Sequence, residues 1–190
     1  SHYRLSIHLI IAFIILSLIF WNYLKIIKVP ICENKIKFSS PLILLILIYC
    51  QIIIGAFVSG MDAGKIYNTW PLMGLSYFPD DNNFINLLKL TVFNDPSLVQ
   101  FIHRNMAYLI LFYYIYIFIK IYKNKFESLF FAINILGLLL IVQILLGIFT
   151  LLYGAQIYIA SMHQISSIFL VTSCIYFLYL NTNITRQPLS

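Results

Sequence analysis

Residues 128–151 read SLFFAINILGLLLIVQILLGIFTL and contain no charged side chain. A helix of this length spans about 36 Å, which exceeds the roughly 30 Å thickness of the hydrocarbon core of a bilayer. The run is continuous and aliphatic with aromatic residues mixed in, whereas the strands of a membrane barrel are short and alternate between apolar and polar residues. The segment therefore predicts a membrane-spanning helix.

Four further runs have the same character. The five predicted helices cover Tyr3–Leu24, Pro41–Gly60, Leu98–Ile119, Ser128–Leu151 and Ile157–Leu180. The composition agrees, because 62% of the residues are hydrophobic, 9% are charged and the mean hydropathy is +0.93. These values lie outside the usual range for a soluble domain. We therefore predict an all-α integral membrane protein with five transmembrane helices.

Lysine and arginine residues divide unequally between the two ends of these helices. One end holds Lys25, Lys28, Lys35, Lys37, Lys120, Lys123, Lys125 and Arg186, and the other holds Arg4, Lys65, Lys89 and Arg104 with Asp62, Asp80, Asp81 and Asp95. The positive-inside rule places the basic links in the cytoplasm, or in the matrix of an organelle. The first, third and fifth helices then run inward from the outer surface. Because the chain starts outside at Ser1, without Met or a signal-peptide pattern, we expect a fragment whose upstream membrane helices are missing.

This topology divides the chain into parts. Residues 1–27 form a first helix, 28–40 a cytoplasmic link, 41–182 an up-down-up-down four-helix bundle and 183–190 a cytoplasmic tail. Residues 61–97 form an outer loop that is too long for a simple connection. Its apolar piece from Phe84 to Phe93, FINLLKLTVF, is predicted either as a helix lying in the membrane interface or as a packed or re-entrant loop.

The net charge does not indicate a nucleic-acid-binding protein, and the cysteines do not indicate disulfide bonds. The net charge of +6 is accounted for by the basic links, which would face anionic lipid, so nucleic acid is excluded as a partner. Cys32, Cys50 and Cys174 place no pair in an oxidising compartment, and we expect free thiols.

Three histidines carry the predicted chemistry. His8, His103 and His163 lie in the opening turns of three helices that enter from the same side, roughly 6–9 Å below the outer surface. An ionisable residue inside a spanning helix is a functional hypothesis. Desolvation disfavours the charged imidazole, and the neutral form is the one that ligates iron. The arrangement suits a membrane-embedded haem; for any single histidine, an interhelical hydrogen bond or an interfacial anchor is the alternative.

Bundle geometry pairs two of these histidines. In an up-down-up-down bundle the third and fifth helices run parallel on a diagonal, so His103 and His163 would face each other and hold an iron from both sides. Gly55 and Gly147 lie at that level and would leave room for a flat macrocycle, with close helix packing as the alternative. Arg104 lies at the outer edge, where it could pair with a propionate or only snorkel to the interface.

Three segments carry a resemblance to a known family. They are GAFVSGMDAGKIYNTWPLMG from Gly55 to Gly74, PSLVQFIHRNMAY from Pro96 to Tyr108, and LGIFTLLYGAQIYIASMHQ from Leu146 to Gln164. Together with the opening SHYRLSIHL they resemble the haem A synthase family of respiratory membranes, and the DAG-x-x-YNT-x-PLMG signature is specific. The resemblance implies an eight-helix protein of two four-helix halves, of which this chain would hold the last helix of the first half and all of the second.

The resemblance also implies roles for the histidines. His103 and His163 would be the axial ligands of a bound haem b, and His8 would be a catalytic, iron-binding residue of the half that takes haem O as substrate. The partner of His8 would lie upstream of Ser1. The family oxidises a methyl group of haem O to the formyl group of haem A for cytochrome oxidase. Such chemistry belongs to the iron cofactor, while the protein orients the substrate.

Other polar residues have weaker assignments. Asp62, Asn68 and Thr69 fall inside the signature at the outer rim, where we expect them to bind the propionates or order water; shaping turns is the alternative. Three glutamines, Gln51, Gln143 and Gln164, are expected to bond neighbouring helices rather than to take part in catalysis.

Two other functions stay open, a b-type electron-transfer membrane cytochrome and an inactive truncated remnant or assembly protein. For the synthase we expect haem O, haem A, membrane lipid, haem O synthase and cytochrome oxidase assembly factors as partners, and self-association of the chain is open. The compact chain favours a bacterial inner (cytoplasmic) membrane over a mitochondrial one.

Overall fold

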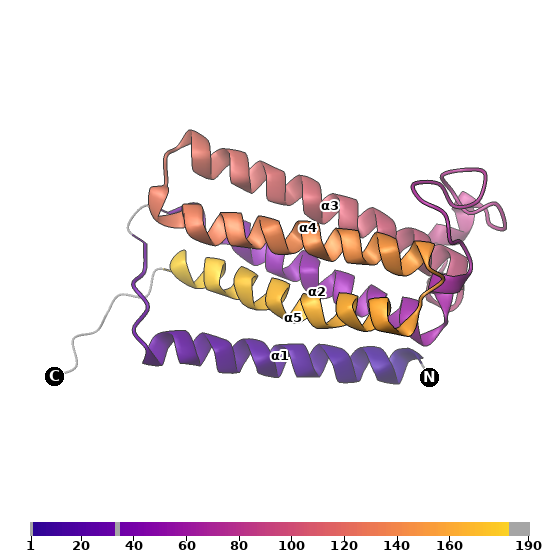
Figure 1. Ribbon diagram of the computed structural model, residues 1–190, viewed down its shortest axis with the longest axis horizontal. Helices are drawn as coiled ribbons and strands as arrows, with labels where there is room; N and C mark the ends of the chain where they lie inside the picture. The colour runs from indigo at the N-terminus through magenta and orange to yellow at the C-terminus, as the bar shows by residue number, and fades with distance from the viewer. Residues whose placement is uncertain (1, 33–34, 183–190) are drawn as a thin grey trace.

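The computed structural model describes residues 2–32 and 35–182 and consists mainly of five long helices (Figure 1). They are α1 (His2–Ile26), α2 (Ser39–Gly60), α3 (Pro96–Lys123), α4 (Phe130–Leu152) and α5 (Ile157–Leu180). All five are long and apolar enough to cross a membrane. The predicted all-α membrane fold with five transmembrane helices is therefore confirmed. The tail predicted at 183–190 and residues 33–34 of the predicted link lie outside the described residues.

Local sequence explains where the third helix begins. The Asp95 carboxylate accepts a hydrogen bond from the Leu98 backbone N–H at 3.0 Å, which caps the helix. Pro96 takes the first helical position, where its missing N–H costs nothing. Lys123 stands in the last turn, where a positive charge suits the helix dipole. The helix is therefore longer at both ends than hydropathy alone predicted.

The helices lie side by side and alternate in direction (Figure 1). Each of α2 and α4 contacts both α3 and α5, and these are the contacts that neighbours make in a four-helix bundle. The first helix lies against α2 and α5. Both α3 and α5 begin at the end of the molecule that carries the outer loop (Figure 1).

Tight packing is concentrated in the half of the molecule away from the outer loop. The side chains that are fully buried there include Ile117, Ile121, Leu129, Ile133, Leu136, Val171, Cys174 and Phe177. Towards the outer loop, residues 141–150 of α4 and 157–166 of α5 are all exposed or half-buried. The histidine level therefore lies in the less tightly packed half.

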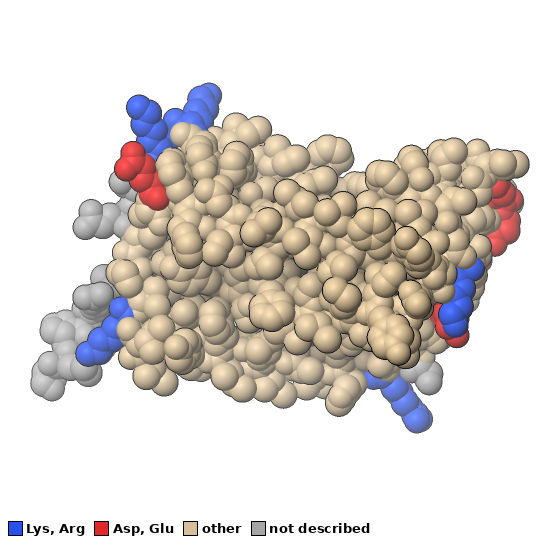
Figure 2. Space-filling view, in the orientation of Figure 1, with Lys and Arg blue, Asp and Glu red and all other residues tan. Residues whose placement is uncertain are grey.

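Charged side chains gather at the two ends of the molecule, and the surface between them is apolar (Figure 2). Along the helices, Ile19, Phe131 and Leu138 are exposed by 64%, 67% and 62%. A band of exposed aliphatic and aromatic side chains suits contact with lipid. The side on which each end lies stays a prediction.

The outer loop contains short 3-10 helices, η1 (Ala63–Lys65), η2 (Phe84–Leu88) and η3 (Leu90–Asn94), and a further one, η4 (Glu127–Leu129), precedes α4. The apolar piece Phe84–Phe93 therefore forms two short turns around Lys89 instead of one continuous helix. Leu88 and Leu90 on either side of Lys89 are 89% and 97% exposed.

Candidate functional site

His103 lies on α3 against the neighbouring helix α2. A Cβ atom added to Gly55 of α2 would lie 3.1 Å from Cε1 of His103, so any other residue there would push the ring away by a few tenths of an ångström. One turn earlier, Gln51 donates its side-chain amide to the backbone carbonyl of His103 at 3.1 Å, and the same nitrogen lies 3.3 Å from His103 Nε2. We call Gln51, Gly55 and His103 the His103 site.

His163 on α5 lies against α4 in the same way. A Cβ atom added to Gly147 would lie 3.0 Å from Cε1 of His163. Gln143 donates to the backbone carbonyl of His163 at 3.0 Å, and its nitrogen lies 3.5 Å from His163 Nε2. The Ser166 hydroxyl donates to Oε1 of Gln143. We call Gln143, Gly147 and His163 the His163 site.

The two histidine sites repeat one arrangement. In each, a glutamine and a glycine four residues apart lie on one face of a helix and meet a histidine on the next helix. Both imidazoles lie about 10 Å along the axis from the start of their helices. The structure thus brings the two predicted ligands to one level on α3 and α5.

Two imidazoles alone do not form a site for a bare metal ion. Within residues 2–32 and 35–182, no group of three or more His, Cys, Asp or Glu side chains is placed to hold one. A haem iron needs only axial ligands, because the porphyrin supplies the other four nitrogens. The Nδ1 atoms of His103 and His163 are buried and have no hydrogen-bond partner among the described residues. The two glycine contacts and the shared level of the two rings fit a haem held by two histidines.

His8 lies apart from these two sites. It is an exposed residue of α1, the helix that packs against α2 and α5. Its distance from the start of its helix is about 9 Å, similar to that of the other two histidines. The structure therefore places His8 at a similar depth but outside the group formed by α2 to α5, and its catalytic role stays a prediction.

Arg104, on α3, anchors the outer loop. Its guanidinium donates to the backbone carbonyls of Tyr67, Thr69 and Leu72 at 3.0, 2.9 and 3.2 Å. Gln100, one turn earlier, donates to the carbonyl of Tyr67 at 3.0 Å. The Nε atom of Arg104 is buried and has no hydrogen-bond partner among the described residues. Three of the five N–H groups of the guanidinium make the bonds to the loop, so the predicted propionate contact would use Nε or the second N–H of Nη2, and it stays a prediction.

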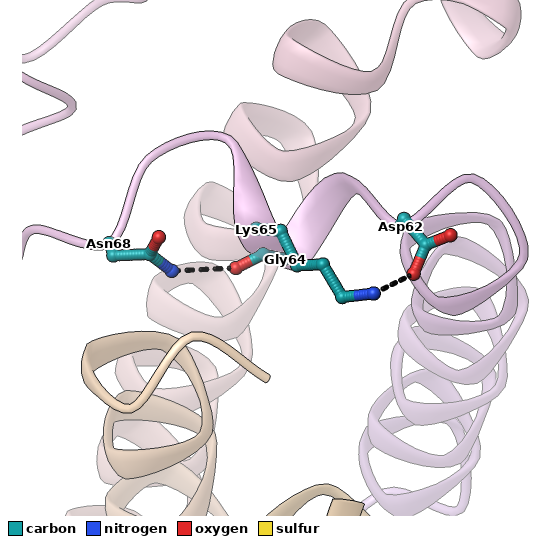
Figure 3. Close-up of polar contacts among 4 residues, drawn as sticks. All are labelled: Asp62, Gly64, Lys65 and Asn68. Atoms are coloured by element: carbon teal, nitrogen blue, oxygen red, sulfur yellow. Dashed lines mark hydrogen bonds and ion pairs between the residues drawn. The ribbon is translucent and has the colours of Figure 1, made fainter. Parts of the chain in front are cut away.

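Asn68 and Asp62 shape the loop that follows α2 (Figure 3). The Asn68 amide donates to the carbonyl of Gly64 at 2.9 Å and to that of Leu151 at 2.8 Å, which ties the outer loop to the end of α4. Asp62 pairs with Lys65 at 2.6 Å, and both side chains are largely exposed. These contacts are those of turn-forming residues, and a role for either residue in cofactor binding stays a prediction.

Thr69 closes the next turn of the same loop. Its hydroxyl donates to the Leu72 carbonyl and accepts from the Gly74 backbone N–H, both at 2.9 Å. Its side chain therefore bonds within the loop. Trp70 extends the contact towards α3, because its indole N–H donates to the Tyr108 hydroxyl at 3.0 Å.

Asp81 holds the outer loop on the first turn of α3, although no sequence pattern singled it out. Its carboxylate accepts from the Ser97 hydroxyl at 2.6 Å and from the Tyr67 hydroxyl at 3.0 Å. Partial burial raises the pKa of Asp81, but these hydrogen bonds outweigh that effect and hold the pKa below its usual value. Burial and the neighbouring Asp81 raise the pKa of Tyr67. The loop is therefore fixed to α3 by an ionised carboxylate.

Comparison with known proteins identifies the family. The family described as cytochrome oxidase assembly protein matches residues 1–175. The chain belongs to this family. The matched range contains both histidine sites, His8 and the signature in the outer loop, so the assignment rests on the region that holds the predicted site residues.

Curated relatives in this family carry one name. A protein named "Heme A synthase" from Pelagibacter ubique (strain HTCC1062) is 46% identical over 186 residues, which cover 96% of this chain and 54% of the relative. Proteins of the same name from Wolbachia pipientis wMel and Rickettsia felis (strain ATCC VR-1525 / URRWXCal2) are each 39% identical; the matches cover 100% and 93% of this chain and 53% of each relative. The chain thus spans about half the length of the curated relatives it matches. No solved structure matches it.

Proposed function

We propose that the protein containing this chain is a haem A synthase, which oxidises a methyl group of haem O to the formyl group of haem A. The observation that carries the proposal is the repeated histidine site in a chain 46% identical to a relative named for that activity. A b-type electron-transfer cytochrome would need the same two histidines, and the relatives' names favour the synthase over it.

The two histidine sites would hold haem b in this proposal. His103 and His163 would hold the haem through their ring nitrogens, and Gly55 and Gly147 let the two rings lie against α2 and α4. The bound haem supplies the oxidation-reduction chemistry. The chain's own contribution is to hold two neutral imidazoles at one level inside an apolar environment.

The outer loop would close the site from the outside. Arg104 holds the loop carbonyls of residues 67–72, and Asn68 ties the loop to α4. A loop that is held at both α3 and α4 restricts the entry of water. The exclusion of water strengthens polar contacts beneath the loop. Asp62 lies at the same rim, where its carboxylate would order water beside the propionates, and in this proposal the Arg104 and Asn68 side chains would meet the propionates themselves.

His8 would serve the substrate haem O. Its exposure on α1 leaves the imidazole accessible to a ligand or to a further helix that packs on that face.

We place the protein in a bacterial inner membrane with the lysine-rich end in the cytoplasm, and we expect haem O synthase and cytochrome oxidase assembly factors as its partners.

The test is conversion of haem O by a complete protein. The chain would be joined to the part of the Pelagibacter ubique relative that it does not match, and membranes containing this chimera would be supplied with haem O. Chromatography of the extracted haems should show haem A, and the His8→Ala variant should show none. Bound haem without haem A would instead identify an electron-transfer cytochrome, and a colourless protein would identify an assembly protein without haem.

A further inference from the structure

We infer that Gln51 and Gln143 are positioning residues, which keep His103 and His163 in the tautomer whose Nε2 is free to bind iron. The inference rests on the proposed haem site and goes beyond it, because it assigns a role to two side chains that do not themselves touch the iron. Its basis is the geometry around each glutamine amide.

The backbone carbonyls of the histidines fix the orientation of both amides. A carbonyl oxygen only accepts hydrogen bonds, so the amide atom 3.1 Å from the His103 carbonyl, and the one 3.0 Å from the His163 carbonyl, must be nitrogen. In the His163 site this assignment places the Gln143 amide oxygen on the Ser166 hydroxyl, which can donate to it. Each histidine therefore faces the donating side of its glutamine.

The orientation of the amide determines which ring nitrogen carries the proton. The amide nitrogen lies 3.3 Å from Nε2 of His103 and 3.5 Å from Nε2 of His163, so a proton on either Nε2 would set two donors against each other. A neutral imidazole has one N–H, and the hydrogen bond made by one nitrogen sets the position of that proton. The proton therefore resides on Nδ1, which is buried without a hydrogen-bond partner among the described residues, and Nε2 keeps its lone pair.

Nε2 is the nitrogen that the proposed haem would use, because it keeps its lone pair. Cε1 of each ring lies against the partner helix, at 3.1 Å from a Cβ added to Gly55 and at 3.0 Å from one added to Gly147. Both ring nitrogens lie 3.5–4.0 Å from these added Cβ atoms. Haem binding then requires only that the amide give up Nε2, since its other N–H stays on the histidine carbonyl.

The experiment is nitrogen NMR of the haem-free chain in detergent with ¹⁵N-labelled histidine rings. The chain has only four histidines, so removing each in turn assigns the signals. We expect His103 and His163 to show a protonated Nδ1 and an unprotonated Nε2. Gln51→Met should move the proton to Nε2 at His103 alone, and Gln143→Met should do so at His163 alone. Gln164→Met is the matched control, because Gln164 is exposed beside His163 and should change neither ring.

Several outcomes would overturn the inference. A proton on Nε2 of both rings in the unsubstituted chain contradicts it, and so does an unchanged tautomer in a folded glutamine variant. If Gln143→Met does not fold, Gln51→Met alone tests the inference, at His103. All of these spectra are taken without haem. A failure to bind haem would therefore refute the proposed function, but the NMR spectra would still show which ring nitrogen carries the proton.

Discussion

The tightest point of the candidate site is the contact between Gly147 and His163, and Gly147→Ala tests it. The new Cβ would lie 3.0 Å from Cε1 and 3.5 Å from Nδ1, so the ring must give way by a few tenths of an ångström. Gln143 holds the backbone of His163 in place, which limits that movement. Overpacking of this kind costs about 1–3 kcal/mol, which corresponds to a loss of haem affinity of roughly 5- to 150-fold.

The assay is a haem titration of the purified chain in detergent, followed by the Soret and α bands. Gly147→Ala should bind haem more weakly and lose part of the low-spin spectrum. Gly64→Ala is the matched control, because a Cβ added there meets no atom closer than 3.5 Å, an ordinary contact distance. An affinity for haem within twofold of the unsubstituted chain in Gly147→Ala would refute the reasoning.

Three further substitutions probe the helices and the outer loop. In Gly137→Ala the new Cβ would lie 2.0 Å from the Tyr114 hydroxyl, so we expect a lower melting temperature by circular dichroism, equivalent to about 2–4 kcal/mol, with the haem spectrum of the folded fraction unchanged. Arg104→Gln removes charged donors from three loop carbonyls and should cost about 2–4 kcal/mol, seen as faster proteolysis within residues 67–72. The lowered pKa of Asp81 means that its contribution to folding is fully present above its unfolded pKa and is lost as pH falls through its lower folded pKa. Asp81→Asn should therefore destabilise the chain at pH 7 and make less difference in strong acid; an equal loss at both pH values would contradict the assignment.

The spanning helices could be predicted closely, because apolar runs of this length have few alternatives in a membrane protein. The predicted run Ile157–Leu180 coincides with α5. The start of α3 could not be found from hydropathy, since it depends on the Asp95 cap and on Pro96. The piece Phe84–Phe93 was apolar enough to suggest a helix, but its sequence did not indicate that it would break at Lys89.

The site was predictable only in part, for a physical reason. His103 and His163 stand out because polar residues are rare in spanning helices, and bundle geometry then places them at one level. The partners of Arg104 are backbone carbonyls of a folded loop, and no periodicity in the sequence encodes them. The Gln51 and Gln143 amides were expected to bond neighbouring helices, but their contact with the histidines appears only in the structure. The only sequence feature that could have indicated this contact is that each glutamine lies four residues before a glycine, Gly55 or Gly147.

The most direct measurement of the central claim is the absorption spectrum of the purified, haem-loaded chain. Ligation by two histidines predicts a low-spin Soret and α band that is lost in both His103→Ala and His163→Ala and retained in His8→Ala. A chain that stays colourless with haem, or a low-spin spectrum that survives both substitutions, would contradict the claim that His103 and His163 hold the iron.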